Sequence, residues 1–79
     1  MRARVLIRPK EGILDPQGQA VGSSLRQLGF DVADTRIGRL VELELETTDA
    51  DEARRQVERM CEQLLANSLI ENYEIDVGA

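Results

Sequence analysis

Hydrophobic and polar residues alternate in four short segments, and a two-residue period is typical of β-strands. The segments are Arg4–Arg8, Phe30–Ile37, Leu40–Glu46 and Leu69–Val77. In the third segment apolar and acidic residues alternate strictly: Val41, Leu43 and Leu45 lie on one side, and Glu42, Glu44 and Glu46 on the other. This alternation predicts a sheet with one covered face. Gly38 and Arg39 alone separate the second and third segments, which predicts a two-residue β-hairpin.

A first helix is predicted over Pro16–Leu28. Asp15 is a good N-cap residue, Pro16 suits the first helical position, and Gly29 suits a left-handed C-terminal cap. The spacing of three and four residues places an apolar stripe along this helix, formed by Ala20, Val21, Leu25 and Leu28.

A second helix is predicted to begin after Asp49, because Asp49 and Glu52 have the spacing of a capping box. It ends at Asn67 and Ser68. Its apolar stripe has helical spacing and consists of Ala53, Val57, Met60, Cys61, Leu64 and Leu65.

The element order βαββαβ predicts an α+β fold of the ferredoxin-like type, in a single domain over residues 1–79. Such a fold has a four-stranded antiparallel sheet with two helices on one face. The other face of the sheet is only half polar, so we expect it to be a dimer surface. The candidates are Leu6, Thr35, Ile37, Leu40, Glu42 and Glu44. The alternative is that these are scattered surface apolar residues with no partner.

Composition narrows the classes of function. A chain of 79 residues buries a limited apolar area and benefits from external stabilisation. With one cysteine and no histidine, disulfides and a zinc site are excluded, which leaves oligomerisation. The net charge of −5 disfavours nucleic acid, and no segment has the roughly 20 apolar residues that span a membrane. We expect a cytoplasmic protein without nucleic-acid or membrane partners.

The sequence gives little support for a catalytic or ligand-binding residue. Cys61 lies on an apolar stripe without an activating histidine, and Ser23 and Ser24 lack a nucleophile motif. Gly12 and Gly18 flank a helix start but match no phosphate-binding motif. The three glutamates of Leu40–Glu46 are about 7 Å apart along a strand, too far apart to hold one cation. We therefore expect no catalytic residue, no cofactor and no metal on this chain.

Three stretches together resemble one family: KEGILDPQGQAV, RIGRLVEL and MCEQLLANSLIENYEI, at residues 10–21, 36–43 and 60–75. They are similar to the PurS subunit of phosphoribosylformylglycinamidine synthase. The resemblance extends over nearly the full chain and includes its small size. It implies membership of a ligase complex of purine biosynthesis.

The resemblance also implies that three different subunits of the complex have separate roles. A PurQ-type glutaminase releases ammonia, and a PurL-type synthetase uses ATP and magnesium to convert formylglycinamide ribonucleotide to its amidine. The small subunit forms homodimers or higher homo-oligomers, bridges the other two subunits and supports ammonia transfer, without an active site of its own.

Two groups of residues are candidates for docking these partners. The first is the loop that precedes the first helix: Lys10, Gly12, Ile13, Leu14, Asp15, Pro16, Gln17 and Gly18. The second is Asn67, Glu71 and Tyr73. Local roles are the alternative for both groups, since Asp15 and Pro16 also start a helix, and the second group also suits helix capping and strand packing.

A regulatory function also fits the predicted element order. Regulatory small-molecule-binding modules of the ACT type have the βαββαβ order and dimerise through sheets, so the fold alone does not exclude them. Such modules usually occur fused to an enzyme, and they bind amino acids near a glycine-rich first loop. An acylphosphatase-like enzyme lacks support because the phosphate-cradling loop is missing.

Overall fold

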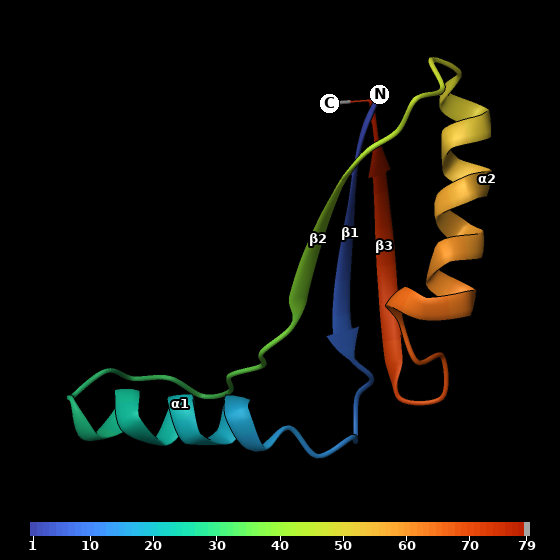
Figure 1. The fold of residues 1–79 in the computed structure, drawn as a ribbon. Helices are drawn as coiled ribbons and strands as arrows, with labels where there is room; N and C mark the ends of the chain where they lie inside the picture. The colour runs from blue at the N-terminus through green and yellow to red at the C-terminus, as the bar shows by residue number, and fades with distance from the viewer. Residues whose placement is uncertain (79) are drawn as a thin grey trace.

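The computed structural model describes residues 1–78, which form an antiparallel sheet and two helices, the second ending in a π-helical turn (Figure 1). The elements are β1 (Arg2–Pro9), α1 (Pro16–Gln27), β2 (Arg39–Glu44), α2 (Ala50–Met60), η1 (Cys61–Leu65) and β3 (Glu71–Val77). The α+β class is confirmed. The two helices and three of the four predicted strands lie close to their predicted positions.

The strand order is β2-β1-β3, with β1 in the centre and both neighbours antiparallel to it. Val5 of β1 lies opposite Val41 of β2 and Ile75 of β3. Because side chains alternate along a strand, this register places Val5, Val41 and Ile75, together with the residues two positions away from each, on the same face. That face forms the core, as the alternation in Leu40–Glu46 predicted.

Helix α2 begins where the sequence predicted. The carboxylate of Asp49 accepts a hydrogen bond from the backbone N–H of Asp51 at 2.9 Å, which satisfies a donor of the first turn. The reciprocal half of the capping box is missing. The Glu52 carboxylate instead accepts hydrogen bonds from Arg55 at 2.9 Å and from Gln56 at 3.1 Å.

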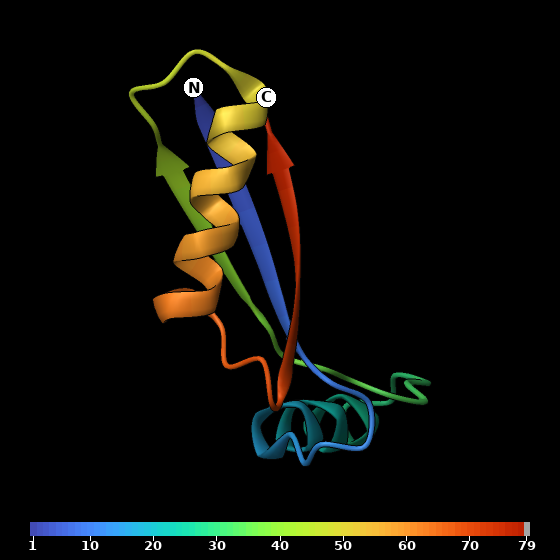
Figure 2. The ribbon, with the colours of Figure 1, turned by 90° about the vertical axis from the view of Figure 1, so that its right-hand side faces the viewer.

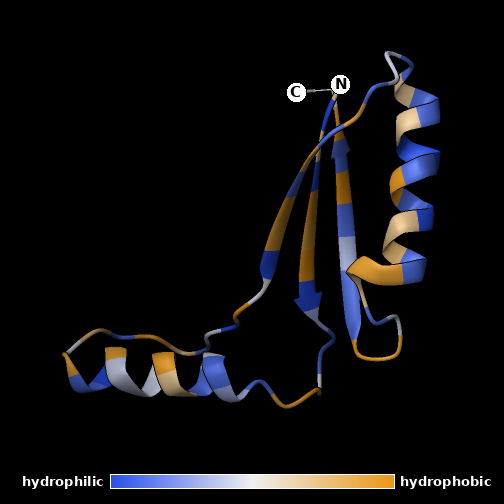
Figure 3. Cartoon of the chain, viewed as in Figure 1, coloured by the Kyte–Doolittle hydropathy of each residue, from blue (hydrophilic) through white to orange (hydrophobic). Residues whose placement is uncertain are grey.

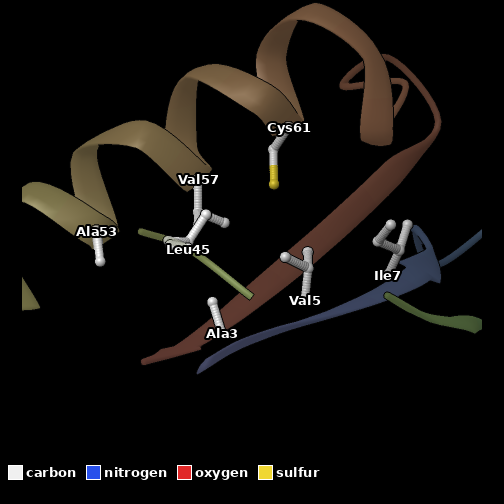
Figure 4. Packing of buried hydrophobic residues seen from close by; sticks show 7 residues of the cluster. All are labelled: Ala3, Val5, Ile7, Leu45, Ala53, Val57 and Cys61. Atoms are coloured by element: carbon white, nitrogen blue, oxygen red, sulfur yellow. The ribbon is translucent and has the colours of Figure 1, made fainter. Parts of the chain in front are cut away.

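The apolar side of α2 covers one face of the sheet, and its hydrophilic residues lie on the side away from the sheet (Figures 2 and 3). The side chains of α2 and β1 point toward one another across this layer (Figure 4). Burying them is the main stabilising contribution, since apolar burial yields about 25 cal/mol per Å². The core residues are Ala3, Val5, Ile7, Leu45, Ala53, Val57 and Cys61.

A π-helical turn ends the second helix. The N–H of Ala66 donates to the carbonyl oxygen of Cys61 at 3.1 Å, a span of five residues. This wider turn changes the direction of the side chains after Cys61. Leu65 is half-buried against the core, whereas Leu64 is 83% exposed, so the prediction that Leu64 belongs to the buried stripe is wrong.

Residues 10–38, here called the arm, contain α1 and lie apart from the core. The arm extends from the base of the sheet on the side away from α2 (Figures 1 and 2). The chain measures 47 × 26 × 14 Å, with a radius of gyration of 15.7 Å. A compact domain of this length has a radius of gyration of roughly 12 Å. The prediction that both helices cover one face of the sheet is therefore wrong for the single chain.

The predicted strand Phe30–Ile37 and its hairpin with β2 are also not formed within residues 1–78. This segment instead runs back along α1. The helix meets it through Gly18 and Gly22, which are buried, while the predicted stripe of α1 is largely exposed. A Cβ atom on Gly18 would lie 2.5 Å from the carbonyl oxygen of Thr35, so glycine permits this close approach.

Within residues 1–78, no helix has both the length and the apolar character needed to cross a membrane.

Candidate functional site

The loop before α1 is the first candidate docking surface. Its start is fixed by the N–H of Lys10, which donates to the carbonyl oxygen of Ile70 at 2.8 Å. Ile13 N–H then donates to the carbonyl oxygen of Lys10 at 3.2 Å, closing a turn in which Gly12 has a φ of 82°. A positive φ is readily adopted only by glycine. The start of the loop is therefore ordered by its backbone, which leaves the side chains of Ile13 and Leu14 exposed.

Asp15 ties this loop to the end of the arm. Its Oδ1 accepts from the N–H of Gly18 at 2.9 Å, and its Oδ2 accepts from the N–H of Ile37 at 2.8 Å. These two hydrogen bonds, the one from Ile37 first, hold the pKa of Asp15 below its ordinary value of 3.8. The N-cap role of Asp15 is confirmed, whereas its bond to Ile37 has no local signal in the sequence.

The apolar side chains of the loop project into solvent. Leu14 is 69% exposed, and Ile13 and Gln17 are exposed beside it. Pro16 is exposed at the first position of α1. The exposed side chains Ile13, Leu14 and Gln17 therefore lie together on one ordered loop.

A hollow of about 360 Å³ lies between the loop and the end of the arm. Its charged lining is mainly acidic, with Glu11, Asp15 and Asp34 against the single Arg36. The N–H of Gly18 is already occupied by Asp15. The three carboxylates would repel a bound phosphate, and the Gly18 N–H is not free to donate to it. The hollow is therefore unsuited to phosphate.

Asn67 and Glu71 organise the connection between η1 and β3. The carboxylate of Glu71 accepts from the N–H of Asn67 at 2.9 Å and from the guanidinium of Arg39 at 2.9 Å. The Asn67 N–H, followed by Arg39, holds the pKa of Glu71 below its ordinary value. The Asn67 side chain in turn accepts from the N–H of Leu69 at 3.1 Å. Both residues thus have the local roles that the sequence left open as the alternative.

Tyr73 joins the two docking candidates. Its ring packs against the core, and it also lines a hollow of about 690 Å³ at the base of the sheet. Lys10 lies in the same hollow. The structure therefore brings together Lys10 and Tyr73, while Asn67 lies in the turn before β3 and Glu71 is the first residue of β3.

The open face of the sheet carries four of the six predicted dimer residues. Leu6 lies opposite Leu40, and the arginines of β1 lie opposite the glutamates of β2, as Arg2 with Glu44 and Arg4 with Glu42. Thr35 and Ile37 are instead on the arm, because the predicted hairpin is open. The central arginine row was not predicted on this face, although its signal is the alternation of Arg2, Arg4 and Arg8 in the first strand.

The groups tested for catalysis remain unsuited to it. Cys61 is fully buried, and burial raises the pKa of its thiol, which disfavours the reactive thiolate. Ser23 and Ser24 are exposed on α1. Within residues 1–78, no three cysteine, aspartate or glutamate side chains gather as a metal site would require.

Comparisons with known proteins agree with this description. The family model for PurS, phosphoribosylformylglycinamidine (FGAM) synthase, matches residues 2–79. The chain is 47% identical over 77 residues to phosphoribosylformylglycinamidine synthase subunit PurS from Synechocystis, covering 96% of this chain and 77% of the relative.

Solved structures match over similar lengths. The PurS structure from Bacillus subtilis is 42% identical, with a TM-score of 0.85, and the match covers 99% of this chain and 98% of that one. A chain of the PurLQS structure from Thermotoga maritima is 29% identical, with a TM-score of 0.88 and coverage of 95% and 93%. The chain described here belongs to the PurS family of phosphoribosylformylglycinamidine synthase.

Proposed function

We propose that this chain is the small, non-catalytic subunit of a phosphoribosylformylglycinamidine synthase in de novo purine biosynthesis. In this role it forms homodimers or higher homo-oligomers and bridges a PurQ-type glutaminase and a PurL-type synthetase. The synthetase uses ATP and magnesium, and this chain binds neither. The complex works in the cytoplasm, and its small subunit is one domain over residues 1–79.

The observation that carries this proposal is the match to a chain of the Thermotoga maritima PurLQS structure, over 95% of this chain at a TM-score of 0.88. A single shared fold element does not account for agreement over that length. The family match also favours the PurS interpretation over the ACT-type alternative.

The chemistry of the described residues supports a positional role. Cys61, the only thiol, is buried, and six of the exposed large apolar residues, from Ile13 to Ile37, lie on the arm that extends from the core. Ammonia that escapes into water is protonated and lost as a nucleophile. A bridge that holds a glutaminase against a synthetase therefore acts by raising the effective concentration of ammonia at the second site.

Two surfaces fit the two tasks of this role. The loop Lys10–Gly18, continued by Tyr73 through the shared hollow, is the proposed docking surface for the larger subunits. The open face and outer edge of the sheet, with Leu6, Leu40, Glu42 and Glu44, are the proposed surface for self-association. We further propose that the four-stranded ferredoxin-like arrangement is completed on self-association.

Reconstitution tests the bridging role. The synthetase and glutaminase are assayed with and without this chain, using either glutamine or ammonium salt as nitrogen source. We expect omission to lower glutamine-dependent turnover strongly and to leave ammonia-dependent turnover in place. Glutamine-dependent turnover that is unchanged without this chain would show that the bridging role is wrong.

A further inference from the structure

The hollow at the base of the sheet, here called the basal hollow, has an excess of positive charge. Its volume is about 690 Å³. Its charged lining consists of Arg8, Lys10 and Arg36, with Glu11 and Glu74. The chain as a whole is acidic, with a net charge of −5. The basal hollow is thus a local positive region on a negative protein, and such a region attracts anionic groups.

Two of the three basic groups have no carboxylate partner. Arg8 forms an ion pair with Glu74 at 3.2 Å, which accounts for one charge of each sign. The guanidinium of Arg36 donates instead to a backbone carbonyl oxygen, which is neutral. Lys10 forms no ion pair within residues 1–78. Since Glu11 is the one other carboxylate of this described lining, a single positive charge is left for a ligand.

A neutral donor stands beside these charges. The Tyr73 hydroxyl borders the basal hollow and makes no side-chain hydrogen bond within residues 1–78. Partial burial raises the pKa of Tyr73 above its ordinary value of 10.0, so the hydroxyl keeps its proton at neutral pH. The Lys10 ammonium offers three further donors. A carboxylate, which accepts several hydrogen bonds through two oxygens, suits this set of donors.

One carboxylate fits the basal hollow better than a phosphate group does. A phosphate monoester carries close to two negative charges at neutral pH, whereas the excess here is one positive charge. Glu11 and Glu74 would also repel a doubly charged group more strongly. The Lys10 N–H already donates to the carbonyl oxygen of Ile70 at 2.8 Å, so this backbone donor is not free to bind phosphate.

The surroundings of the basal hollow favour a protein segment as the source of the carboxylate. The basal hollow shares Glu11 and Arg36 with the smaller hollow that Ile13 lines. Ile13 is 39% exposed, and Leu14 follows it on the same loop with an exposure of 69%. A small free carboxylate would leave these apolar groups in water, whereas a peptide carries acidic and apolar side chains together. The smaller hollow is mainly acidic and repels a carboxylate, which directs it to the basal hollow.

We propose that the basal hollow binds a carboxylate side chain from an acidic segment of one of the two larger subunits, and that an apolar residue of that segment packs on Ile13 and Leu14. Lys10 and Arg36 neutralise the carboxylate, and Tyr73 donates a hydrogen bond to it. This inference rests on the proposed bridging function and specifies the chemistry of the partner at the docking surface.

Zero-length cross-linking tests the contact directly, because Lys10 is the only lysine of the chain. A carbodiimide activates a carboxyl group; an amine in contact with that group then forms an amide bond, and the carbodiimide leaves as a urea with the displaced oxygen. The chain is mixed with synthetase and glutaminase, treated and digested for mass spectrometry. We expect an amide between Lys10 Nζ and an aspartate or glutamate of a larger subunit.

The matched control for cross-linking is Lys10→Arg, which retains the positive charge but lacks the primary amine. At protein concentrations that saturate the complex, the product at position 10 should disappear. A product that joins Lys10 only to carboxylates of this chain, or of a second copy of it, would overturn the proposal.

Charge reversal gives a second test. Lys10→Glu should weaken binding to the larger subunits by about tenfold or more at low salt and by less at high salt, because salt screens charges at a surface. Arg59→Glu makes the same change of charge on the exposed side of α2, outside the basal hollow, and should leave the affinity unchanged. Titration calorimetry at the two salt concentrations compares the variants. Equal losses from both would show a general effect of net charge and overturn the proposal.

The same samples separate this inference from the bridging role. If Lys10→Glu binds as tightly as the natural chain and supports the same glutamine-dependent turnover, the carboxylate site is wrong and the bridging role stands. If the natural chain binds neither larger subunit, both are wrong. Displacement of the natural chain by inorganic phosphate at lower concentration than by acetate would show a preference for phosphate, and this would also overturn the carboxylate site.

Discussion

The carboxylate of Asp15 holds the N–H of Ile37 at 2.8 Å, across 22 positions of sequence. The same carboxylate caps α1 through Gly18 at 2.9 Å. One side chain thus joins both ends of the arm, the loop that carries the exposed Leu14 and the segment that leads to β2.

Replacing Asp15 should loosen the arm while sparing the sheet. Asp15→Ala removes both hydrogen bonds, so we expect faster amide exchange at Gly18 and Ile37 and a lower melting temperature. Asp15→Asn retains an acceptor and should have the smaller effect. Asp31→Ala is the control, because Asp31 is exposed on the same arm and makes no hydrogen bond within residues 1–78. Unchanged exchange at Ile37 in Asp15→Ala would contradict this role.

Gly18→Ala should destabilise the protein, although glycine-to-alanine changes in helices usually stabilise by about 0.5–1 kcal/mol. The added Cβ would lie 2.4 Å from the Asp15 carboxylate and 2.5 Å from the Thr35 carbonyl oxygen. Overpacking of this kind costs about 1–3 kcal/mol in the free energy of unfolding, measured by chemical denaturation. Ser24→Ala, on the exposed side of α1, should change it by less than about 0.5 kcal/mol. A stabilised Gly18→Ala variant would refute the close packing of α1 on residues 30–37.

Protonation of Glu71 at acidic pH should lower the free energy of unfolding. Its folded pKa is lowered below the ordinary value of 4.5 by the Asn67 N–H and by Arg39. A lowered folded pKa contributes stability that is fully present above about pH 4.5 and is lost as the pH falls through the folded pKa. Glu71→Gln should therefore lose less stability than the natural chain between about pH 6 and about pH 3.

The matched control for this titration is Glu46→Gln, because Glu46 is exposed and makes no ion pair within residues 1–78. It should retain the full acid sensitivity of the natural chain. If Glu71→Gln and Glu46→Gln lose stability in parallel, Glu71 does not carry the effect.

Leu14→Ser should weaken docking to the synthetase and glutaminase without affecting the core. Leu14 is 69% exposed, so the change costs little folding stability, whereas loss of an apolar anchor weakens binding by about tenfold. Leu64→Ser is the comparison, because Leu64 is 83% exposed but lies on η1, away from the loop. Titration calorimetry distinguishes the variants; equal affinities for both would place the docking surface elsewhere.

Local signals explain why most elements were predictable. Asp15 with Pro16 fixed the start of α1, and Asp49 fixed the start of α2. Strict alternation around Val41 identified the buried face of β2. Each of these signals depends on neighbours a few residues away, and such short-range preferences persist in almost any tertiary arrangement.

The incorrect predictions concern residues that interact across long distances in the sequence or depend on an unusual helical turn. A hairpin that is closed and one that is open at Gly38 share the same alternation, so the alternation does not say whether residues 30–37 pair with β2 within one chain. The bond from Ile37 to Asp15 joins residues that no local pattern connects. Leu64 was misplaced because a π-helical turn changes the angular spacing on which the apolar stripe was based.

The conformation of the proposed docking residues was predictable in part, and their docking role stays a prediction. The loop around Leu14 was identified correctly as exposed and ordered, whereas Asn67 and Glu71 turned out to stabilise their own turn. The arginine row of β1 was not predicted on the open face, where it lies opposite the glutamates of β2.

Sedimentation of the three-component mixture tests most directly whether this chain is a bridge. The synthetase and glutaminase are run together with their nucleotide substrates, once with this chain and once without it. We predict a complex containing all three components in the first run and separate synthetase and glutaminase in the second. Equal association of the two large subunits in both runs, with this chain sedimenting alone, would contradict the account.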